Sequence, residues 1–113
     1  MNKRQTGSEW ERKAVEYLAQ NGYTIIQTNY RCKIGEIDII AKESDTLCFI
    51  EVKYRSDKRY GNAIEAVTPS KQNTIRKTAL HYLVTVMHSD NIDCRFDVIG
   101  FDGGEITIIK NAF

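Results

Sequence analysis

The sequence predicts a mixed α/β domain, on the border of the α+β class, with a central sheet of about five strands flanked by helices. Patterns typical of helices and strands follow one another in the order helix, three strands, helix, two strands. Only a sheet covered by helices buries the apolar faces of all these elements. The chain has 113 residues, is 42% hydrophobic and contains a single proline. We therefore expect residues 1–113 to fold as one globular domain.

The first helix is expected over SEWERKAVEYLAQNG, residues 8–22. Apolar residues recur there at helical spacing, namely Trp10, Ala14, Tyr17 and Leu18. Asn21-Gly22 supplies a stop signal.

Three strands are expected next, because the runs YTIIQTNYR, EIDIIA and LCFIEVKYR are rich in Ile, Val, Phe and Tyr. They begin at Tyr23, Glu36 and Leu47. The polar stretch KESDT separates the last two and predicts a hairpin loop.

A second helix is expected to begin at Thr68-Pro69, which fits an N-cap followed by the first helical position. Its predicted apolar face consists of Ile75, Ala79, Tyr82, Leu83 and Val86. The runs CRFDVIGF and EITIIK then flank Asp102-Gly103-Gly104, which predicts a hairpin of two final strands.

Composition and cysteine usage exclude several classes of protein. No apolar run approaches the length of a membrane span, and the first residues lack the apolar core of a signal peptide, so we expect a cytoplasmic protein without a membrane partner. Cys32, Cys48 and Cys94 are odd in number and never form a CxxC pattern, which indicates neither disulfides nor zinc. His81 and His88 stand seven apart on the expected helix, without the clustered ligands of a zinc site.

The charge distribution suggests a contact with phosphates. The net charge of +1 gives no global basic field. Between Lys53 and Lys77, however, only Asp57 and Glu65 oppose a local run of basic residues. These are Lys53, Arg55, Lys58, Arg59, Lys71, Arg76 and Lys77. Such a stretch suits nucleic-acid phosphates, although an ordinary solvated surface explains it equally well.

Charged residues inside the second and third strands point to a metal site. If residues 43–46 form the loop, Lys42 pairs with Leu47, and counting outward sets Asp38 opposite Glu51. Two facing carboxylates repel unless a cation lies between them, and oxygen ligands favour magnesium or manganese. Lys53 points to the same face as Glu51 and could contact the attacked phosphate or orient the water. The set suits phosphodiester hydrolysis.

A simpler interpretation of the same spacing stays open. EVKYR could be an amphipathic strand end, with Ile50, Val52 and Tyr54 inward, Glu51 and Lys53 in solvent, and Glu36 paired with Lys53. A one-residue slip in register would also separate the two acids.

The motifs GEIDIIA and FIEVKYR, with Asn29-Tyr30-Arg31 and a helix carrying Glu11 before them, resemble the YraN-like family of small bacterial proteins. That family is placed in the restriction-endonuclease-like superfamily with the PD-(D/E)XK motif. The resemblance runs from Trp10 through Asp97. Two positions depart from the pattern: Ile37 stands where the superfamily label has Pro, and Trp10 replaces the small glycine usual before Glu11.

The resemblance implies a restriction-endonuclease-like core in which Asp38 and Glu51 hold the metal and Lys53 is the catalytic lysine. It implies for Glu11 a helix-borne acid that touches the metal, often through water. Ser8-Glu9-Trp10-Glu11 also spells a capping box, which explains Glu11 without chemistry.

Further residues are candidates for contacts with nucleic acid. Lys71 and Gln72 open the second helix, where the helix dipole disfavours a lysine and favours a phosphate. The candidate set is Arg31, Arg55, Lys58, Arg59, Lys71 and Gln72.

The leading hypothesis is a magnesium- or manganese-dependent nuclease acting on DNA, with branched or resolvase-type structures as candidate substrates. The alternatives are a nucleic-acid-binding module that keeps the fold without hydrolysis, and a domain with a purely structural or protein-binding role. Cleavage of a four-way junction needs two active sites, which makes a homodimer an option.

Overall fold

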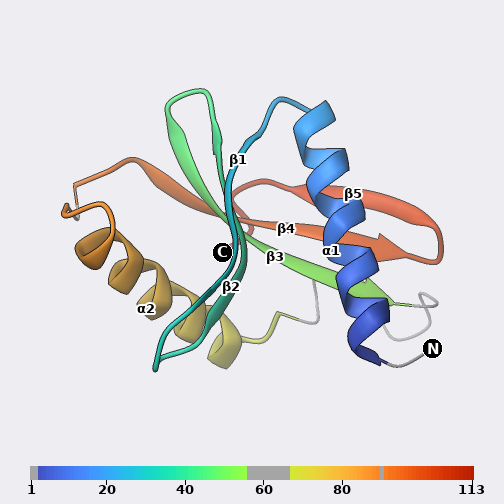
Figure 1. Ribbon diagram of the computed structural model, residues 1–113, viewed down its shortest axis with the longest axis horizontal. Coiled ribbons are helices and arrows are strands. Elements are labelled where there is room, and N and C mark those ends of the chain that lie inside the picture. Colours follow the sequence, from blue (N-terminus) through green and yellow to red (C-terminus); the bar gives the residue numbers. More distant parts are fainter. Residues whose placement is uncertain (1–2, 56–66, 90) are drawn as a thin grey trace.

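Helices and strands follow one another along the chain in the predicted order. The computed structural model describes residues 3–55, 67–89 and 91–113. The elements are α1 (Lys3–Gln20), β1 (Thr24–Arg31), β2 (Glu36–Glu43), β3 (Thr46–Arg55), α2 (Pro69–Thr85), β4 (Cys94–Asp102) and β5 (Glu105–Ile109) (Figure 1). The prediction of a mixed α/β domain with a sheet of five strands is confirmed.

The sheet has the strand order β1-β2-β3-β4-β5. Neighbouring strands are antiparallel except β3 and β4, which run parallel. A parallel pair needs a crossover connection, and α2 lies between these two strands in the sequence. The expected hairpin of β4 and β5 turns at Gly103 and Gly104, whose φ angles of 56° and 98° suit glycine.

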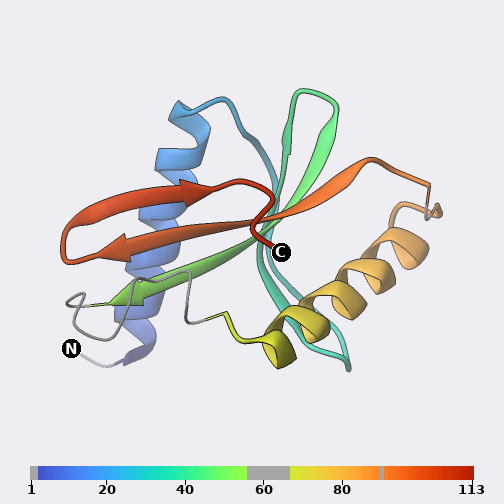
Figure 2. The ribbon, with the colours of Figure 1, turned by 180° about the vertical axis from the view of Figure 1, so that it is seen from behind.

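The two helices cover opposite faces of the sheet (Figures 1 and 2). Alternate residues of β3 show this arrangement, because successive side chains of a strand point to opposite faces. Phe49 packs in the cluster that contains Ile75 of α2, whereas Ile50 packs in the cluster that contains Leu18 of α1. The sheet is therefore the middle layer of three, and each helix closes a separate apolar core.

The helix ends differ from the expected ones. Helix α1 begins at Lys3, so Ser8 lies within the helix and is not its N-cap. Helix α2 begins as expected, with Thr68 as N-cap and Pro69 in the first turn, but it ends at Thr85. Beyond this end the chain turns away, since His88 has a φ of 56° and the Ser89 N–H donates to the Leu83 carbonyl. His88 is therefore not helical, and Val86, expected on the apolar face, is exposed.

A network of ion pairs and hydrogen bonds links strands of the sheet near the β2–β3 hairpin. Asp97 is fully buried and accepts hydrogen bonds from Arg95 Nε at 2.9 Å and from the Tyr23 hydroxyl at 2.9 Å. Arg95 Nη2 also donates to Glu43 Oε1 at 2.5 Å, and Lys110 Nζ donates to Glu43 Oε2 at 2.7 Å. A buried carboxylate needs such partners. At one end of the sheet, this network joins Tyr23, which precedes β1, to strands β2 and β4 and to Lys110, which follows β5.

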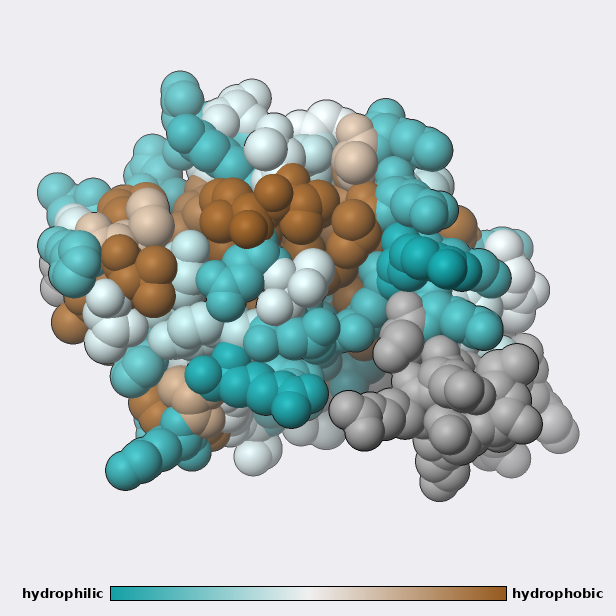
Figure 3. All heavy atoms as spheres, viewed as in Figure 1, coloured by the Kyte–Doolittle hydropathy of each residue, from teal (hydrophilic) through white to brown (hydrophobic). Residues whose placement is uncertain are grey.

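Polar and charged residues surround a band of apolar atoms on the face shown in Figure 3. Within the described parts of the chain, no helix is long and apolar enough to cross a membrane.

Candidate functional site

The candidate site lies where β2 and β3 separate. The predicted pairing of Lys42 with Leu47 is confirmed, and the ladder continues as far as Ile39 and Ile50. The next two residues are Asp38 and Glu51, at which the ladder stops. From there β2 pairs only with β1, and β3 pairs only with β4, so the two strands diverge (Figure 1).

A side chain replaces the missing ladder bond at this point. The Val52 N–H donates to Asp38 Oδ2 at 2.8 Å. The Asp38 and Glu51 carboxyl groups are close enough for each to shift the pKa of the other. The facing acids expected from the register are therefore brought together, at the opening between the strands.

Both carboxyl groups are held where ionisation is costly. Only 5% of Glu51 is exposed. Burial, followed by the nearby charge of Asp38, raises the pKa of Glu51 to about 7, against a smaller opposite effect of Lys71 and Lys53. Burial also raises the pKa of Asp38, although the Val52 N–H lowers it in part. A cation between the two groups would remove the cost of ionising both.

Two lysines approach the same carboxylate oxygen. Lys53 Nζ lies 3.6 Å from Glu51 Oε1, and Lys71 Nζ lies 3.7 Å from it. Lys53 belongs to β3 itself, and Lys71 belongs to the first turn of α2. Thr68 is the N-cap of this helix, and its hydroxyl accepts a hydrogen bond from the Lys71 N–H. The interpretation in which Glu51 and Lys53 are solvated and Glu36 pairs with Lys53 is wrong, because Glu51 is buried and Glu36 pairs with Arg31.

Glu11 reaches the neighbourhood of the site through Asn29. Asn29 Nδ2 donates to Glu11 Oε2 at 3.4 Å. Asn29 has a φ of 55° and lies across from Asp38, between the register pairs of Thr28 and Tyr30 with β2. Burial raises the pKa of Glu11, and the charges of Asp38 and nearby Glu36 add to this effect. The capping-box interpretation of Glu11 loses its basis, because α1 begins before Ser8.

The donor set fits a hard divalent cation. In the part of the chain that the structure describes, no three acid, histidine or cysteine side chains converge as a complete ligand set. Asp38 and Glu51 are paired, whereas Glu11 lies beside them. Magnesium is commonly held by one or two carboxylates while it keeps several waters, so two carboxylates with a third acid nearby suit it.

The expected nucleic-acid contacts have different environments. Arg31 is exposed and forms an ion pair with Glu36 at the rim of the opening. Lys71 lies at Glu51, but the Gln72 side chain donates to the Val67 carbonyl at 3.0 Å and helps to fix the start of α2. Lys58, Arg59 and the side chain of Arg55 lie outside the described residues.

Two further residues position the site. Asn29 belongs to the motif Asn29-Tyr30-Arg31, but no role was predicted for it. The sequence signal that could have indicated one is the residue type, because Asn adopts positive φ more readily than most residues. Gly35 precedes β2, and a Cβ atom there would lie 2.7 Å from Thr74 Cγ2 and 3.0 Å from Thr78 Oγ1. The absence of a side chain at Gly35 thus lets α2 approach the β1–β2 connection.

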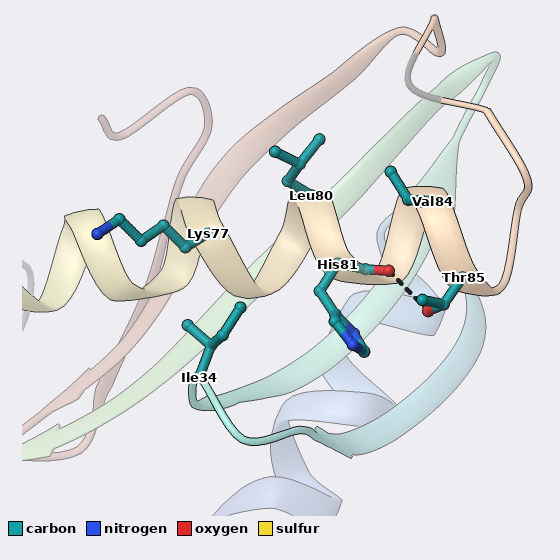
Figure 4. A pocket seen from close by; sticks show the side chains of 6 residues that line it. All are labelled: Ile34, Lys77, Leu80, His81, Val84 and Thr85. Atoms are coloured by element: carbon teal, nitrogen blue, oxygen red, sulfur yellow. Dashed lines mark hydrogen bonds between the residues drawn. The ribbon is translucent and has the colours of Figure 1, made fainter.

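A cavity of about 320 Å³ lies along α2, away from the candidate site. Figure 4 shows its lining residues, Ile34, Lys77, Leu80, His81, Val84 and Thr85. The Tyr30 hydroxyl lies 2.6 Å from His81 Nδ1, and Thr85 donates to the His81 carbonyl. No residue expected in the site lines this cavity, and its walls are mostly apolar.

Sequence comparisons relate this chain to one family. Residues 10–101 match the model of "Uncharacterised protein family UPF0102". A UPF0102 protein of Lachnoclostridium phytofermentans is 46% identical over 113 residues, which cover 100% of this chain and 96% of the relative. One from Caldicellulosiruptor saccharolyticus is 44% identical, with 100% of each chain covered. One from Nitrosomonas europaea is 43% identical, with 95% of this chain and 92% of the relative covered.

Proposed function

The chain belongs to the UPF0102 family, which is the YraN-like family that its motifs resemble, and we propose that it is a divalent-metal-dependent nuclease that hydrolyses phosphodiester bonds in DNA. Branched or resolvase-type DNA is the proposed substrate. Membership of the restriction-endonuclease-like superfamily is part of the proposal.

One observation carries the proposal. Two carboxyl groups, Asp38 and Glu51, face each other at the point where two strands separate, and a lysine follows on the same strand. A pair of acids with raised pKa values is costly for a protein without a cation. The same pair, at the point where β2 and β3 separate, suits metal-assisted chemistry on a phosphate.

The side chains divide the work in the following way. Asp38 and Glu51 would hold the cation, with Glu11 on its outer side through water. A bound magnesium or manganese ion would lower the pKa of the attacking water and neutralise charge on the phosphate. Lys53 lies 3.6 Å from Glu51 Oε1 and would turn to the attacked phosphate once the cation takes its place beside Glu51.

The DNA backbone would lie over the start of α2. Lys71 would hold a neighbouring phosphate there, where the N-terminus of a helix favours an anion. Arg31, at the rim of the opening, would contact another phosphate. A cytoplasmic location is part of the proposal, and a homodimer would supply the second active site that a four-way junction needs.

Cleavage of labelled DNA tests the proposal. Duplex, single-stranded and branched DNA are incubated with magnesium, manganese or chelator. We expect products only with metal, and a loss of about 100-fold or more in Asp38→Asn, because the metal's contribution to the barrier is several kcal/mol. Lys53→Ala should lose about 100- to 1,000-fold, the usual effect of removing one stabilising donor.

Matched variants serve as controls in the same assay. Asp45→Asn removes an exposed acid from the β2–β3 loop, and Lys42→Ala removes an exposed lysine from β2; both should cleave as the wild type does. Cleavage that survives in chelator, or in Asp38→Asn, would overturn the nuclease proposal.

A second function is favoured by a specific contact. Glu51 already has two lysine partners, so the opening is neutralised in part without a cation. This observation favours a nucleic-acid-binding module without hydrolysis. Salt-dependent DNA binding in chelator, with no cleavage of any of the substrates, would support this second function instead.

A further inference from the structure

An aromatic stack lies on the α1 face of the sheet, whereas Glu51 and Lys53 of the same strand, β3, face α2. The ring of Trp10 in α1 stacks on the ring of Tyr54 in β3, with 4.1 Å between centroids and 21° between planes. Phe101 of β4 supports Trp10 from inside, at 4.9 Å between centroids. Figures 1 and 2 both show the first half of α1 beside the end of β3.

The stack joins the two elements that carry candidate catalytic residues. Trp10 directly precedes Glu11, and Tyr54 directly follows Lys53. Trp10 stands where the family pattern has a small residue, and its large ring packs against Tyr54. Tyr54 lies three residues beyond Glu51, which is roughly 10 Å along β3, since one residue of a strand spans about 3.3 Å.

Burial separates Tyr54 from the other aromatic residues on this side of the sheet. Tyr23 and Phe101 are 4% and 2% exposed and belong to the core. Tyr54 is 46% exposed, although its ring already has a stacking partner. A half-exposed ring at the outer end of a stack can accept one more flat ring.

A positive charge accompanies the rings. Lys13 Nζ lies 4.6 Å from the centroid of the Trp10 ring. Proteins that bind single-stranded nucleic acid combine aromatic rings, on which bases stack, with lysines or arginines that follow the backbone. The stack and Lys13 provide both components within one turn of α1 and the end of β3.

We propose that Tyr54 stacks with an unpaired base of DNA, which extends the stack of Trp10 and Tyr54, while Lys13 contacts the backbone. This inference rests on the proposed function for the kind of ligand and adds the substrate class to it. A base within a duplex has neighbours on both faces, so Tyr54 would select single-stranded segments or the unpaired bases of branched DNA.

Binding in chelator tests the inference, because no cleavage then disturbs the equilibrium. A labelled single-stranded oligonucleotide and its duplex are titrated with wild type, Tyr54→Phe, Tyr54→Leu and Tyr54→Ala. Tyr54→Phe keeps the ring and should bind as wild type does. Tyr54→Leu keeps apolar area without a ring, and it and Tyr54→Ala should bind the single strand about 5- to 150-fold more weakly, the usual loss for one stacked base. Duplex affinity should change less than about twofold, because no stacked base is lost there.

The single tryptophan of the chain gives an independent signal. Trp10 emission should change when the single strand binds the wild type, and this change should be absent in Tyr54→Leu. Thermal unfolding identifies any variant that fails to fold. If Tyr54→Ala fails to fold, the comparison of Tyr54→Phe with Tyr54→Leu decides whether the ring is needed for single-strand binding. Equal single-strand affinity in these two variants, or equal losses for single strand and duplex, would overturn the inference.

The inference and the proposed function can fail separately. If Tyr54 determines single-strand affinity but no DNA is cleaved with metal, the nuclease proposal is overturned and the base platform stands. If DNA is cleaved with metal but Tyr54→Leu binds the single strand as Tyr54→Phe does, only the platform is overturned.

Discussion

Glu51 is an acid in a place where its charge is expensive. It is 5% exposed, it faces another carboxyl group, and its pKa is raised to about 7. A buried carboxylate reduces stability unless it is well paired, and Lys53 and Lys71 offset the charge of Glu51 only in part. A cation between Glu51 and Asp38 would offset the rest. At the residue scale the electrostatic cost at Glu51 is thus the main physical support for a metal site.

Replacing Glu51 by glutamine should remove a loss of stability at higher pH. The pKa of Glu51 is raised from 4.5 to about 7 in the folded protein, so over this pH range the folded state binds more protons than the unfolded state. The free energy of unfolding therefore falls as pH rises from about 4.5 to about 7, by on the order of 1–3 kcal/mol. Urea unfolding of wild type and Glu51→Gln in chelator, between about pH 4.5 and about pH 8, measures the difference.

The control for this prediction is Glu16→Gln, which changes an exposed acid on α1. It should follow the pH dependence of the wild type. Parallel curves for wild type and Glu51→Gln would contradict the raised pKa.

At the scale of elements, the position of α2 decides whether Lys71 reaches Glu51. The helix comes close to the connection before β2, where Gly35 contacts the threonine pair Thr74 and Thr78. The Gln72 side chain and the Thr68 hydroxyl fix the helix start at the same end. These contacts set the distance between the first turn of α2 and the opening between the strands.

Gly35→Ala should move α2 or strain this contact. The added Cβ would lie 2.7 Å from Thr74 Cγ2, so we expect a loss of about 1–3 kcal/mol in the free energy of unfolding. Thr74→Ser removes Cγ2, and the double variant Gly35→Ala/Thr74→Ser should recover part of the loss. Chemical denaturation of the four proteins in this cycle measures the coupling. A Gly35→Ala variant as stable as the wild type would refute the close approach.

Elements and register could be predicted from the sequence because local signals specify them. Ser44 and Asp45 form the turn, so Lys42 faces Leu47 and the two acids follow. The start of α1 could not be predicted in this way, because Gly7 lies within the helix and glycine usually weakens one.

Contacts between distant parts of the chain could not be predicted from the sequence. Glu11 was a candidate from its motif, but the hydrogen bond that its side chain accepts from Asn29 of β1 could not be foreseen. The Gln72 side chain, a predicted phosphate contact, donates a hydrogen bond to the Val67 carbonyl where the chain enters α2, a contact that no local pattern indicates. Such features follow from tertiary packing, which local patterns do not encode.

At the scale of the whole molecule, the sheet has two ends with different roles. Near the β2–β3 hairpin, Arg95 neutralises the buried Asp97, and every carboxylate of the network has a partner. Where β2 and β3 separate, the acids Asp38 and Glu51 face each other instead. The two opposed carboxyl groups therefore lie at the opening between the start of α2 and the first half of α1, where Lys53 and Lys71 offset part of their charge.

Calorimetric titration with manganese measures directly whether this opening holds a divalent cation. The wild type should bind one ion per chain in the opening, and its affinity should rise from about pH 6 to about pH 8 as Glu51 loses its proton. Asp38→Asn should lose this binding, whereas Asp45→Asn should keep it. No heat of binding in the wild type, or the same binding in Asp38→Asn, would contradict the account.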